Sequence, residues 1–458
     1  MANIIFTNKC NIKCPFCFAS ENNAESNMND ILQFDASKTW SISTFLNKKD
    51  FRFCGGEPTI NPNICEIADL LLKQDYEIFF MTNGIWNNKF TEYIKHLPFK
   101  NVNKIRYLFN VLEPSLYKNN EIEILKRSLA TIINPLRVTL GFTIYKEDFN
   151  YEYLIDLALE YNIKNIRWSV ASPNISNYDE NVGETKFSRI ANKLYELHNS
   201  CISNNLILNG DCNYIQPCFW DNSQLSELLI KNAKKIQFNC SNGSPVDIGA
   251  DGMAWRCYGL YSVMKTNISK FKNDEELEKY FTRRVKLLNN MFAYEECQNC
   301  QYWQKGCNGG CYVYRIKRAI KQKSDIVLFP IDNDVEILKC KPFKKDNVII
   351  KTENEEDILI LNYTIISNED ENTLQFLKNI DGEKSINELI SMWKDNFSSI
   401  EKAQSIIIAK CRELFDKDYI GINYQYDIVP GKKPSKPIPL SNTDVTKEPI
   451  EVEALLRS

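Results

Sequence analysis

The first two hundred residues alternate between two kinds of pattern, and this alternation restricts the possible folds more than any other feature. Short apolar runs rich in β-branched and aromatic residues predict strands, and apolar residues at helical spacing predict helices between them. The strands are predicted at NIIFTN (3–8), FRFC (51–54), YEIFFMTN (76–83), KIRYLFNV (104–111), RVTLGFTIY (137–145) and NIRWSV (165–170). Alternating strands and helices predict an α/β fold with a parallel sheet, here an open or partial (β/α)6 barrel of the TIM type.

The helical stretches carry boundary signals as well as periodicity. Asn61 is predicted to cap a helix that has Pro62 in its first turn. Two apolar faces follow at helical spacing, one made by Ile64, Ile67, Ala68 and Leu71 and the other by Ile122, Leu125, Leu129 and Ile132.

Three motifs follow the first three predicted strands. Cys10, Cys14 and Cys17 come after the first strand, CGGEP (54–58) after the second and TNG (82–84) at the end of the third. Ligands of parallel α/β sheets bind at the carboxyl ends of the strands. We therefore expect these motifs to lie side by side and to form a site.

The cysteine content points to metal. The chain of 458 residues has 16 cysteines but only two histidines, with 43% hydrophobic residues, 25% charged residues and a net charge of −3. No secretory signal and no apolar run long enough to span a bilayer is visible, so we expect a cytoplasmic protein without a membrane partner. Thiols in a reducing compartment favour metal binding over disulfides, and thiolates select zinc or iron–sulfur clusters.

The three N-terminal cysteines do not by themselves decide between zinc and an iron–sulfur cluster. Their C-x3-C-x2-C spacing can supply three of the four iron ligands of a cubane cluster and leave one iron open. A structural zinc wants a fourth protein ligand, and none is near in sequence. The neighbouring motif favours the cluster, because two glycines admit a ligand close to the backbone and Glu57 can accept hydrogen bonds from an amine.

These residues resemble the radical SAM superfamily over roughly residues 1–205. The matching features are the cysteine loop, with Phe16 in the aromatic position, and the Gly-Gly-Glu-Pro stretch. The resemblance implies a [4Fe–4S] cluster on the three cysteines that binds S-adenosylmethionine (SAM) at its open iron, and radical chemistry started by one-electron cleavage of SAM. It also implies a set of SAM contacts, at Phe16 (adenine), Gly55, Gly56, Glu57 and Pro58 (methionine amino group), Asn110 (ribose) and, more loosely, Leu140–Tyr145 and Val170–Ala171.

A second group of cysteines has a spacing of its own. It runs C240-x11-G252-x4-C257, then C297-x2-C300-x6-C307-x3-C311, then C340. A zinc ribbon would use Cys297, Cys300, Cys307 and Cys311 and would leave the other three unexplained. The pattern over residues 206–345 instead resembles a SPASM domain, apart from six rather than five residues between Cys300 and Cys307. That resemblance implies two auxiliary [4Fe–4S] clusters, three clusters in all.

The resemblance assigns the second group to those two clusters. The cluster nearer the active site takes Cys240, Cys257 and Cys311, and the distal cluster takes Cys297, Cys300, Cys307 and Cys340. The nearer cluster lacks a fourth ligand, which either Cys212 or Cys218 could supply, or the site is open to a substrate thiolate. Four thiols are left as structural residues, Cys54, Cys65, Cys201 and Cys411.

Residues 350–425 predict a small separate module. DILILNYTII (357–366) predicts a strand pair or one long strand, and 371–382 a helix stopped by Gly382. Ser385 and Glu388 form a capping box, and YIGI (419–422) predicts a closing strand. A final amphipathic helix is marked by Ala403, Ile407, Cys411 and Leu414.

Strands followed by three helices suggest a winged helix, but one unsuited to nucleic acid. Residues 351–425 contain fifteen acidic and eight basic residues, a net charge of −7. The module resembles the PqqD-like recognition element that binds the leader of a ribosomal precursor peptide as an added strand. A purely structural role is the alternative. Residues 426–458, rich in proline near their start, predict a flexible tail.

Together these features predict a radical SAM/SPASM oxidoreductase that modifies a ribosomally made precursor peptide, by forming a thioether or carbon–carbon crosslink. The alternatives are a peptide epimerase, a sulfatase-type protein maturase and, from another class, an iron–sulfur electron-transfer protein. The expected partners are the precursor peptide and a one-electron reductant such as flavodoxin or ferredoxin, and no nucleic acid. No general base can be named from the sequence.

Overall fold

The chain divides into two compact units, which we describe separately. The computed structural model describes residues 2–19, 34–171, 174–175, 182–211, 215–232, 245–288, 293–303, 305–353, 356–362, 364–366 and 370–434. The first unit comprises Met1–Leu277, Ala293–Lys317 and Pro430–Ser458, and the second comprises Glu278–Phe292 and Arg318–Val429. In the part of the chain so described, no helix combines the length and the apolar character needed to cross a membrane.

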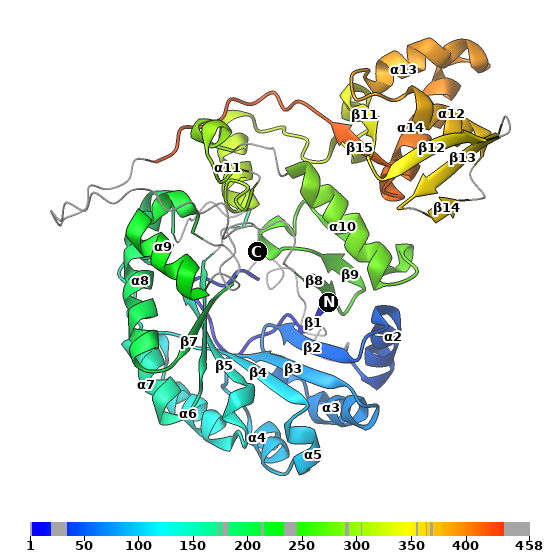
Figure 1. Ribbon diagram of the computed structural model, residues 1–458. Helices are drawn as coiled ribbons and strands as arrows, with labels where there is room; N and C mark the ends of the chain where they lie inside the picture. The colour runs from blue at the N-terminus through cyan, green and yellow to red at the C-terminus, as the bar shows by residue number, and fades with distance from the viewer. Residues whose placement is uncertain are drawn as a thin grey trace. The chain divides into compact units, whose positions relative to one another are not determined.

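The first unit is built on a large, mostly parallel sheet (Figure 1). All six predicted strands are present within a residue or two of the predicted bounds, and a seventh follows them. They lie in chain order in the sheet, each parallel to the next. The strands are β1 (Ala2–Thr7), β2 (Asp50–Gly55), β3 (Glu77–Thr82), β4 (Ile105–Asn110), β5 (Val138–Ile144), β6 (Asn165–Val170) and β7 (Ile207–Gly210).

Helices lie along the outer side of this sheet (Figure 1). They are α2 (Ala36–Leu46), α3 (Ile64–Lys73), α4 (Asn88–Lys95), α5 (Phe99–Val102), α6 (Glu121–Thr131), α7 (Glu152–Glu160) and α8 (Phe187–Ser203). The predicted face of α3 is buried as expected. The predicted cap is wrong, because α3 begins after Asn63, and the Asn61 carboxamide oxygen accepts the Asn63 N–H at 2.8 Å in the preceding turn.

An aromatic column fills the space between the sheet and the helices near its start. The rings of Phe53 and Phe80, on neighbouring strands, stack with centroids 4.9 Å apart, and Phe6 meets Phe53 edge-on at 5.0 Å. All three side chains are fully buried. This packing fixes β1, β2 and β3 relative to one another, and these are the strands whose carboxyl ends carry the three motifs.

The segment after the seventh strand returns to the other edge of the same sheet. β8 (Val246–Gly249) pairs in parallel with β1, and β9 (Met253–Trp255) and β10 (Lys265–Asn267) continue the sheet in antiparallel fashion. The Asn3 carboxamide donates a buried hydrogen bond of 2.9 Å to Asp247. The sequence did not predict this extension. The remaining helices that begin in this unit are α9 (Asn222–Asn232), α10 (Asp274–Leu288) and α11 (Tyr312–Gln322).

Among its described residues, the second unit contains two small antiparallel sheets and three α-helices that lie wholly within it. The strands are β11 (Lys341–Lys344) paired with β15 (Ile420–Asn423), and β12 (Val348–Glu353), β13 (Glu356–Leu361) and β14 (Thr364–Ile366) in that order. The helices are α12 (Glu371–Asn379), α13 (Ile386–Trp393) and α14 (Ile400–Asp416). Of the two predictions for 357–366, the strand pair is confirmed and the single long strand is wrong; the three helices and the closing strand are confirmed, and β11 and β12 are additions. The assignment as a winged helix stays a prediction.

Two local signals of this unit are confirmed in detail. Ser385 and Glu388 form the capping box, in which Glu388 accepts the Ser385 N–H at 2.7 Å and Ser385 Oγ accepts the Glu388 N–H at 3.2 Å. Gly382 follows α12 with a φ of +83°, a left-handed conformation that favours glycine. The predicted face of α14 is buried in the core of the unit.

Asp370 provides a test of the energetics of this unit. It caps α12, where its oxygens accept the Thr373 N–H at 2.9 Å and the Thr373 hydroxyl at 2.7 Å, and the Lys410 ammonium lies 3.4 Å away. These bonds hold the pKa of Asp370 at about 2. We expect Asp370→Ala to lower the free energy of unfolding of this unit by about 1 kcal/mol, measured in the full chain by amide hydrogen exchange along α12.

Asp370→Asn is the matched control, because asparagine also caps but carries no charge. Since the folded-state pKa lies below the ordinary value, the contribution of the charge is present above about pH 4 and is lost as the pH falls towards 2. The difference between wild type and Asp370→Asn should shrink over that range. Unchanged exchange along α12 in Asp370→Ala would contradict this account of the cap.

Candidate active site and metal centres

The carboxyl ends of β1 and β2 are locked together by backbone contacts. The Gly56 N–H donates to the Thr7 carbonyl at 2.7 Å, and the Glu57 N–H donates to the Lys9 carbonyl at 2.8 Å. The CGGEP stretch therefore continues the pairing of the strands into the loop that begins the cysteine triplet. The sequence predicted that these motifs would be neighbours, and the structure brings them into direct contact.

The two glycines of this stretch are required by that contact. Gly55 has a φ of +137°, and a Cβ there would lie 2.2 Å from the Thr7 carbonyl oxygen. A Cβ on Gly56 would lie 2.0 Å from the Lys9 carbonyl oxygen and 2.9 Å from the Cys10 nitrogen. Backbone atoms cannot yield to such a clash as a flexible side chain can. Only glycine lets β2 end this close to the cysteine loop.

Glu57 is buried beneath this contact. One carboxylate oxygen accepts the Thr59 N–H at 3.1 Å and the hydroxyls of Thr59 and Thr82 at 2.7 and 2.9 Å, and the other accepts the Asn83 N–H at 2.7 Å. Burial raises the pKa of Glu57, and these hydrogen bonds oppose the shift. The carboxylate thus joins the ends of β2 and β3. Its predicted contact with the SAM amino group stays a prediction, as do those of Gly55, Gly56 and Pro58.

Asn83 and Asn11 support the cysteine loop from the side of β3. The Asn83 carboxamide donates to Asn11 Oδ1 at 2.7 Å and points to Cys10 Sγ at 3.6 Å, and Asn11 donates to the Ile85 carbonyl at 2.7 Å. Sequence reasoning placed TNG at the end of a strand but gave it no role. The available signal was a polar residue at the carboxyl end of the strand next to the glycine motif.

The three N-terminal thiols lie in one exposed to half-buried loop. The Cys17 N–H donates to the Cys14 carbonyl at 3.2 Å, so the loop turns back on itself. Burial raises the pKa of Cys10 to about 11 and of Cys14 to about 12; the charge of Cys17 adds to both shifts, and that of Cys10 adds to the shift of Cys14. Three thiols close enough to feel one another's charge form a donor set that fits an iron–sulfur cluster, whose positive irons keep thiolates deprotonated.

Phe16 and Tyr145 form an aromatic pair beside this loop. Their rings stack at 4.9 Å between centroids, with 29° between the planes. Tyr145 follows the end of β5, so the pair joins the loop after β1 to the opposite part of the sheet. Asn110 is exposed at the end of β4. The predicted contacts of Phe16 and the Tyr145 region with the adenine, and of Asn110 with the ribose, stay predictions.

The segment that follows Cys257 packs on the first loop. The Tyr258 ring meets Phe18 edge-on at 4.8 Å, and Tyr258 and Trp255 belong to a small core with Ala19 and Cys54, against which Cys17 packs. Cys257, predicted to ligate an auxiliary cluster, therefore lies in the chain directly before a residue in contact with the N-terminal loop. Cys212 and Cys240 fall outside the residues that the structure describes.

The other cysteines fall into two environments. Cys218, Cys297, Cys300 and Cys307 are half-buried in the first unit, and Cys311 there is buried. Cys340 lies in the second unit, fully buried in a core that also contains Cys411. Cys54 and Cys201 are buried and Cys65 is half-buried on α3.

Two findings bear on what these thiols can bind. Each of the fourteen cysteines within the described ranges is a thiol rather than half of a disulfide. Within the same ranges, no group of three or more histidine, cysteine or acidic side chains is arranged to hold a metal ion. A polynuclear cluster differs from a single ion, because each thiolate binds its own iron and the thiolates do not converge on one point.

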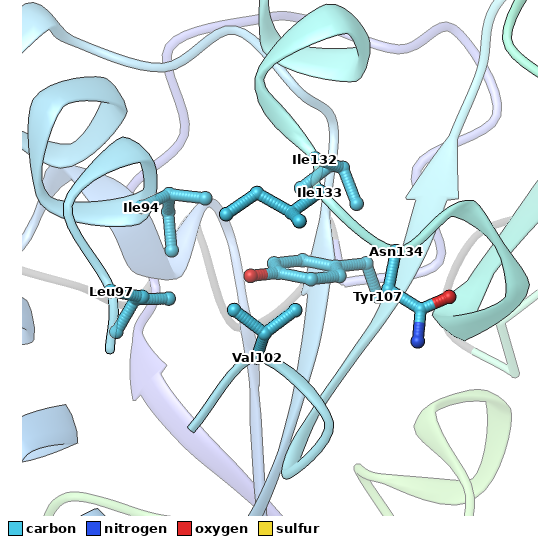
Figure 2. A pocket seen from close by; sticks show the side chains of 7 residues that line it. All are labelled: Ile94, Leu97, Val102, Tyr107, Ile132, Ile133 and Asn134. Atoms are coloured by element: carbon cyan, nitrogen blue, oxygen red, sulfur yellow. The ribbon is translucent and has the colours of Figure 1, made fainter. Parts of the chain in front are cut away.

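A small pocket lies elsewhere, among the outer helices (Figure 2). Figure 2 shows the Tyr107 ring with Val102 below it and the isoleucines above. Val102 precedes β4 and Asn134 precedes β5, so the pocket lies at the amino ends of strands, opposite the motifs, where a role in stability is expected. The lining residues are Ile94, Leu97, Val102, Tyr107, Ile132, Ile133 and Asn134.

Comparison with known families supports the N-terminal resemblance over part of the stretch 1–205 for which it was predicted. Residues 4–111 match the family model described as the radical SAM superfamily. This stretch contains the cysteine loop, the Gly-Gly-Glu-Pro motif, Asn83 and Asn110. The match supports a radical SAM domain that includes residues 4–111.

Individual relatives share low sequence identity with this chain, over part of its length. A probable GTP 3′,8-cyclase of Methanocaldococcus jannaschii is 26% identical over 144 residues, 30% of this chain and 47% of the relative. A GTP 3′,8-cyclase of Clostridium perfringens is 25% identical over 162 residues, 34% of this chain and 49% of the relative. The chain thus spans about half the length of these curated relatives.

Among solved structures, SuiB of Streptococcus suis bound to its precursor peptide SuiA is 18% identical, with 70% of this chain and 73% of that chain covered and a TM-score of 0.49. Similarity at this level does not transfer the neighbour's function to this chain.

Proposed function

We propose that this protein is a radical SAM enzyme that oxidises a ribosomally made precursor peptide, forming a thioether or carbon–carbon crosslink. The observation that carries the radical part is the backbone lock between the cysteine loop and Gly55–Glu57, in a stretch that matches the radical SAM superfamily. The GTP cyclase relatives align with only about a third of this chain, so their substrate gives no basis for proposing one here. The peptide part is supported by the second cysteine group and by the C-terminal unit.

Cys10, Cys14 and Cys17 would hold the first cluster, with SAM at the open iron. When bound, this cofactor pair supplies one-electron cleavage of SAM to methionine and a 5′-deoxyadenosyl radical that abstracts hydrogen from an unactivated C–H bond. The chain's own residues position the reactants. Glu57 and Asn83 brace the loop, and Gly55 and Gly56, packed directly on that loop, would present their backbone to the methionine end of SAM.

The stacked pair of Phe16 and Tyr145 would form an aromatic wall for the adenine. We expect Tyr145→Ala to weaken SAM binding about tenfold, because offset stacking contributes roughly 1 kcal/mol or more. Tyr145→Phe keeps the ring and loses the hydroxyl contacts with Glu113, at 3.4 Å, and with Lys146, so it should bind SAM as the wild type does. Equilibrium dialysis with labelled SAM measures both. Equal weakening in the two variants would contradict a stacking role.

The second cysteine group would hold two auxiliary clusters. A crosslink removes two hydrogens from the peptide, which is a net two-electron oxidation, and an enzyme for such a reaction needs redox centres beyond the one that starts it. With three four-iron clusters, anaerobic reconstitution should give about twelve irons per chain. A flavodoxin or ferredoxin would supply the initiating electron.

The C-terminal unit would bind the leader of the peptide. The sheet β12-β13-β14 has two outer strands, each with one neighbour in that sheet, and an extended segment can add to such an edge. Ile349 on β12 and Ile365 on β14 are 46% and 62% exposed, which gives an added strand apolar side chains to pack on. The net charge of −7 favours a leader with basic residues over nucleic acid.

The test is the mass of a candidate precursor peptide, encoded beside this gene, after anaerobic co-expression with this protein. We expect a loss of two hydrogens or a multiple of two, located by fragmentation. An unchanged mass with deuterium incorporation in deuterated water would favour an epimerase instead. An unchanged mass without incorporation would contradict action on that peptide.

The two remaining alternatives predict different results from the proposed enzyme. A sulfatase-type maturase would modify a folded or nascent protein and would not need the C-terminal unit. An iron–sulfur electron-transfer protein would contain iron and leave SAM intact. The electron-transfer alternative does not explain the backbone contact between the cysteine loop and the two glycines.

A further inference from the structure

Three thiols of the second cysteine group are held by one compact loop of the first unit. The Cys300 N–H donates to the Cys297 carbonyl at 3.1 Å, the Trp303 N–H to the Cys300 carbonyl at 3.0 Å and the Cys307 N–H to the Tyr302 carbonyl at 3.0 Å. These bonds fold the loop so that Cys307 returns towards Cys297 and Cys300 despite the extra residue in the spacing.

Cys218 reaches this loop from a segment almost eighty residues earlier. Gln216, two residues before it, lies against the glycines that follow Cys307, because a Cβ on Gly310 would be 2.1 Å from Gln216 Nε2. Gly310 has a φ of +91°, which permits this close approach. The turn that carries Cys218 is therefore packed directly on the loop of the three thiols.

Lys433 gives a second, independent link between the two segments. Its backbone N–H donates to the Glu296 carboxylate at 3.1 Å, next to Cys297, and its ammonium lies 5.6 Å from the centre of the Phe219 ring, next to Cys218. The Lys433 side chain also hydrogen-bonds Cys218. One residue thus contacts the immediate neighbours of both cysteines.

Charge interactions indicate the same proximity. Cys218, Cys297 and Cys300 all lie near enough to Cys307 for their charges to act on it. Cys218 and Cys300 likewise lie near enough to act on Cys297. The Lys433 ammonium, of opposite charge to a thiolate, lies near enough to act on Cys218.

We propose that Cys218, Cys297, Cys300 and Cys307 together hold one auxiliary [4Fe–4S] cluster, with Cys218 rather than Cys340 as the fourth thiolate. The proposal rests on the proposed function in taking the auxiliary groups to be iron–sulfur clusters. The thiols are not arranged around a single ion, whereas a cubane gives each its own iron. Cys212 is then the remaining upstream candidate to join Cys240, Cys257 and Cys311.

The surroundings of Cys340 fit a structural thiol. It is fully buried in the core of the second unit with Ile337 and Ile386, and its Sγ lies 3.7 Å from the Glu336 carbonyl oxygen. The Ile386 N–H donates to the Cys340 carbonyl at 2.8 Å, so the backbone there serves the packing of α13. A buried cysteine in such a core behaves as a small apolar side chain.

The test is iron and sulfide content per full-length chain after anaerobic reconstitution. Cys218→Ala and Cys300→Ala should each lose about four of about twelve irons, and the double variant should lose no more than either single variant. Cys340→Ala should keep all of its iron. Cys411→Ala, which removes a thiol from the same core as Cys340, is the matched control for any disturbance of that unit.

Several outcomes would overturn the assignment. Full iron in Cys218→Ala with loss in Cys340→Ala would restore Cys340 as the ligand. An additive loss of about eight irons in the double variant would place Cys218 and Cys300 on different clusters. Loss of zinc instead of iron would return the site to a zinc ribbon.

The iron measurement also shows whether each variant has folded, and it does not depend on SAM cleavage. The two clusters that remain in each variant report that the first unit has folded, and Cys218→Ser, closer in size, should show the same loss if the alanine variant does not fold. Iron is counted without SAM. A chain that fails to cleave SAM but shows this pattern would contradict the proposed function and leave the ligand assignment standing.

Discussion

A chain with Cys14→Ala and Cys17→Ala is expected to keep about two thirds of its iron and to form no 5′-deoxyadenosine from SAM. The two substitutions leave Cys10 alone in the loop, and one thiolate cannot hold a cubane. The auxiliary clusters use other cysteines and should remain. Iron analysis and chromatographic quantification of 5′-deoxyadenosine after reduction with dithionite measure the two effects together.

Cys65→Ala is the control for thiol loss as such. Cys65 lies half-buried on α3 in the same domain and is not expected to bind iron. Its substitution should leave both the iron content and SAM cleavage at wild-type values. Continued SAM cleavage in the Cys14, Cys17 double variant would contradict the assignment of the SAM-binding cluster to the N-terminal loop.

Gly56→Ala is expected to abolish SAM cleavage and to remove the iron of the first cluster, although it changes no ligand. The new methyl group would be 2.0 Å from the Lys9 carbonyl oxygen and 2.3 Å from the Lys9 carbonyl carbon. Backbone must move to relieve such an overlap, and the backbone in question leads directly into Cys10. We expect a loss of about four irons and a drop in 5′-deoxyadenosine of at least a hundredfold.

Gly249→Ala is the matched control. Gly249 lies at the end of β8, on the other side of β1, and pairs with Ile5. A Cβ there would meet the Asp251 carboxylate at 2.7 Å, a flexible side chain that can turn away. Its iron content should be unchanged. Normal iron and normal SAM cleavage in Gly56→Ala would show that the contact between the two loops is not needed.

The strands of the first unit could be predicted closely because they are buried in a parallel sheet. Burial between helices requires near-continuous apolar runs, and residues such as Phe51, Phe53, Ile78 and Phe80 supply them. The lock between Gly56 and the cysteine loop was anticipated only as proximity, because it depends on the register of β1 and β2 and on backbone atoms. The position of Asn83 at the end of β3 was the available signal, but nothing in the sequence specified its contact with Cys10.

The contacts of Cys218 show where prediction from sequence ends. The SPASM resemblance groups Cys297, Cys300 and Cys307 in one cluster, but the approach of Gln216 to Gly310 joins segments about ninety residues apart. Nothing in the sequence between them specifies that approach. The pairing of β8 with β1 was also missed. It too joins distant segments, and a strand of only four residues has too little periodicity to be recognised.

In the second unit the sequence predicted local structure well and left the larger assembly open. The capping box of Ser385 and the left-handed Gly382 are set by neighbouring residues, and both are present. Pairing of β11 with β15 joins residues nearly eighty positions apart, and it was not foreseen. Short edge strands such as β14 depend on their partners more than on their own sequence.

The measurement that tests the central claim most directly is the fate of SAM with the wild-type, anaerobically reconstituted chain and a one-electron reductant. We predict equal amounts of methionine and 5′-deoxyadenosine, formed only when the reductant is present. Intact SAM in a chain that carries about twelve irons would contradict the account, and would leave an iron–sulfur protein whose N-terminal loop serves electron transfer alone.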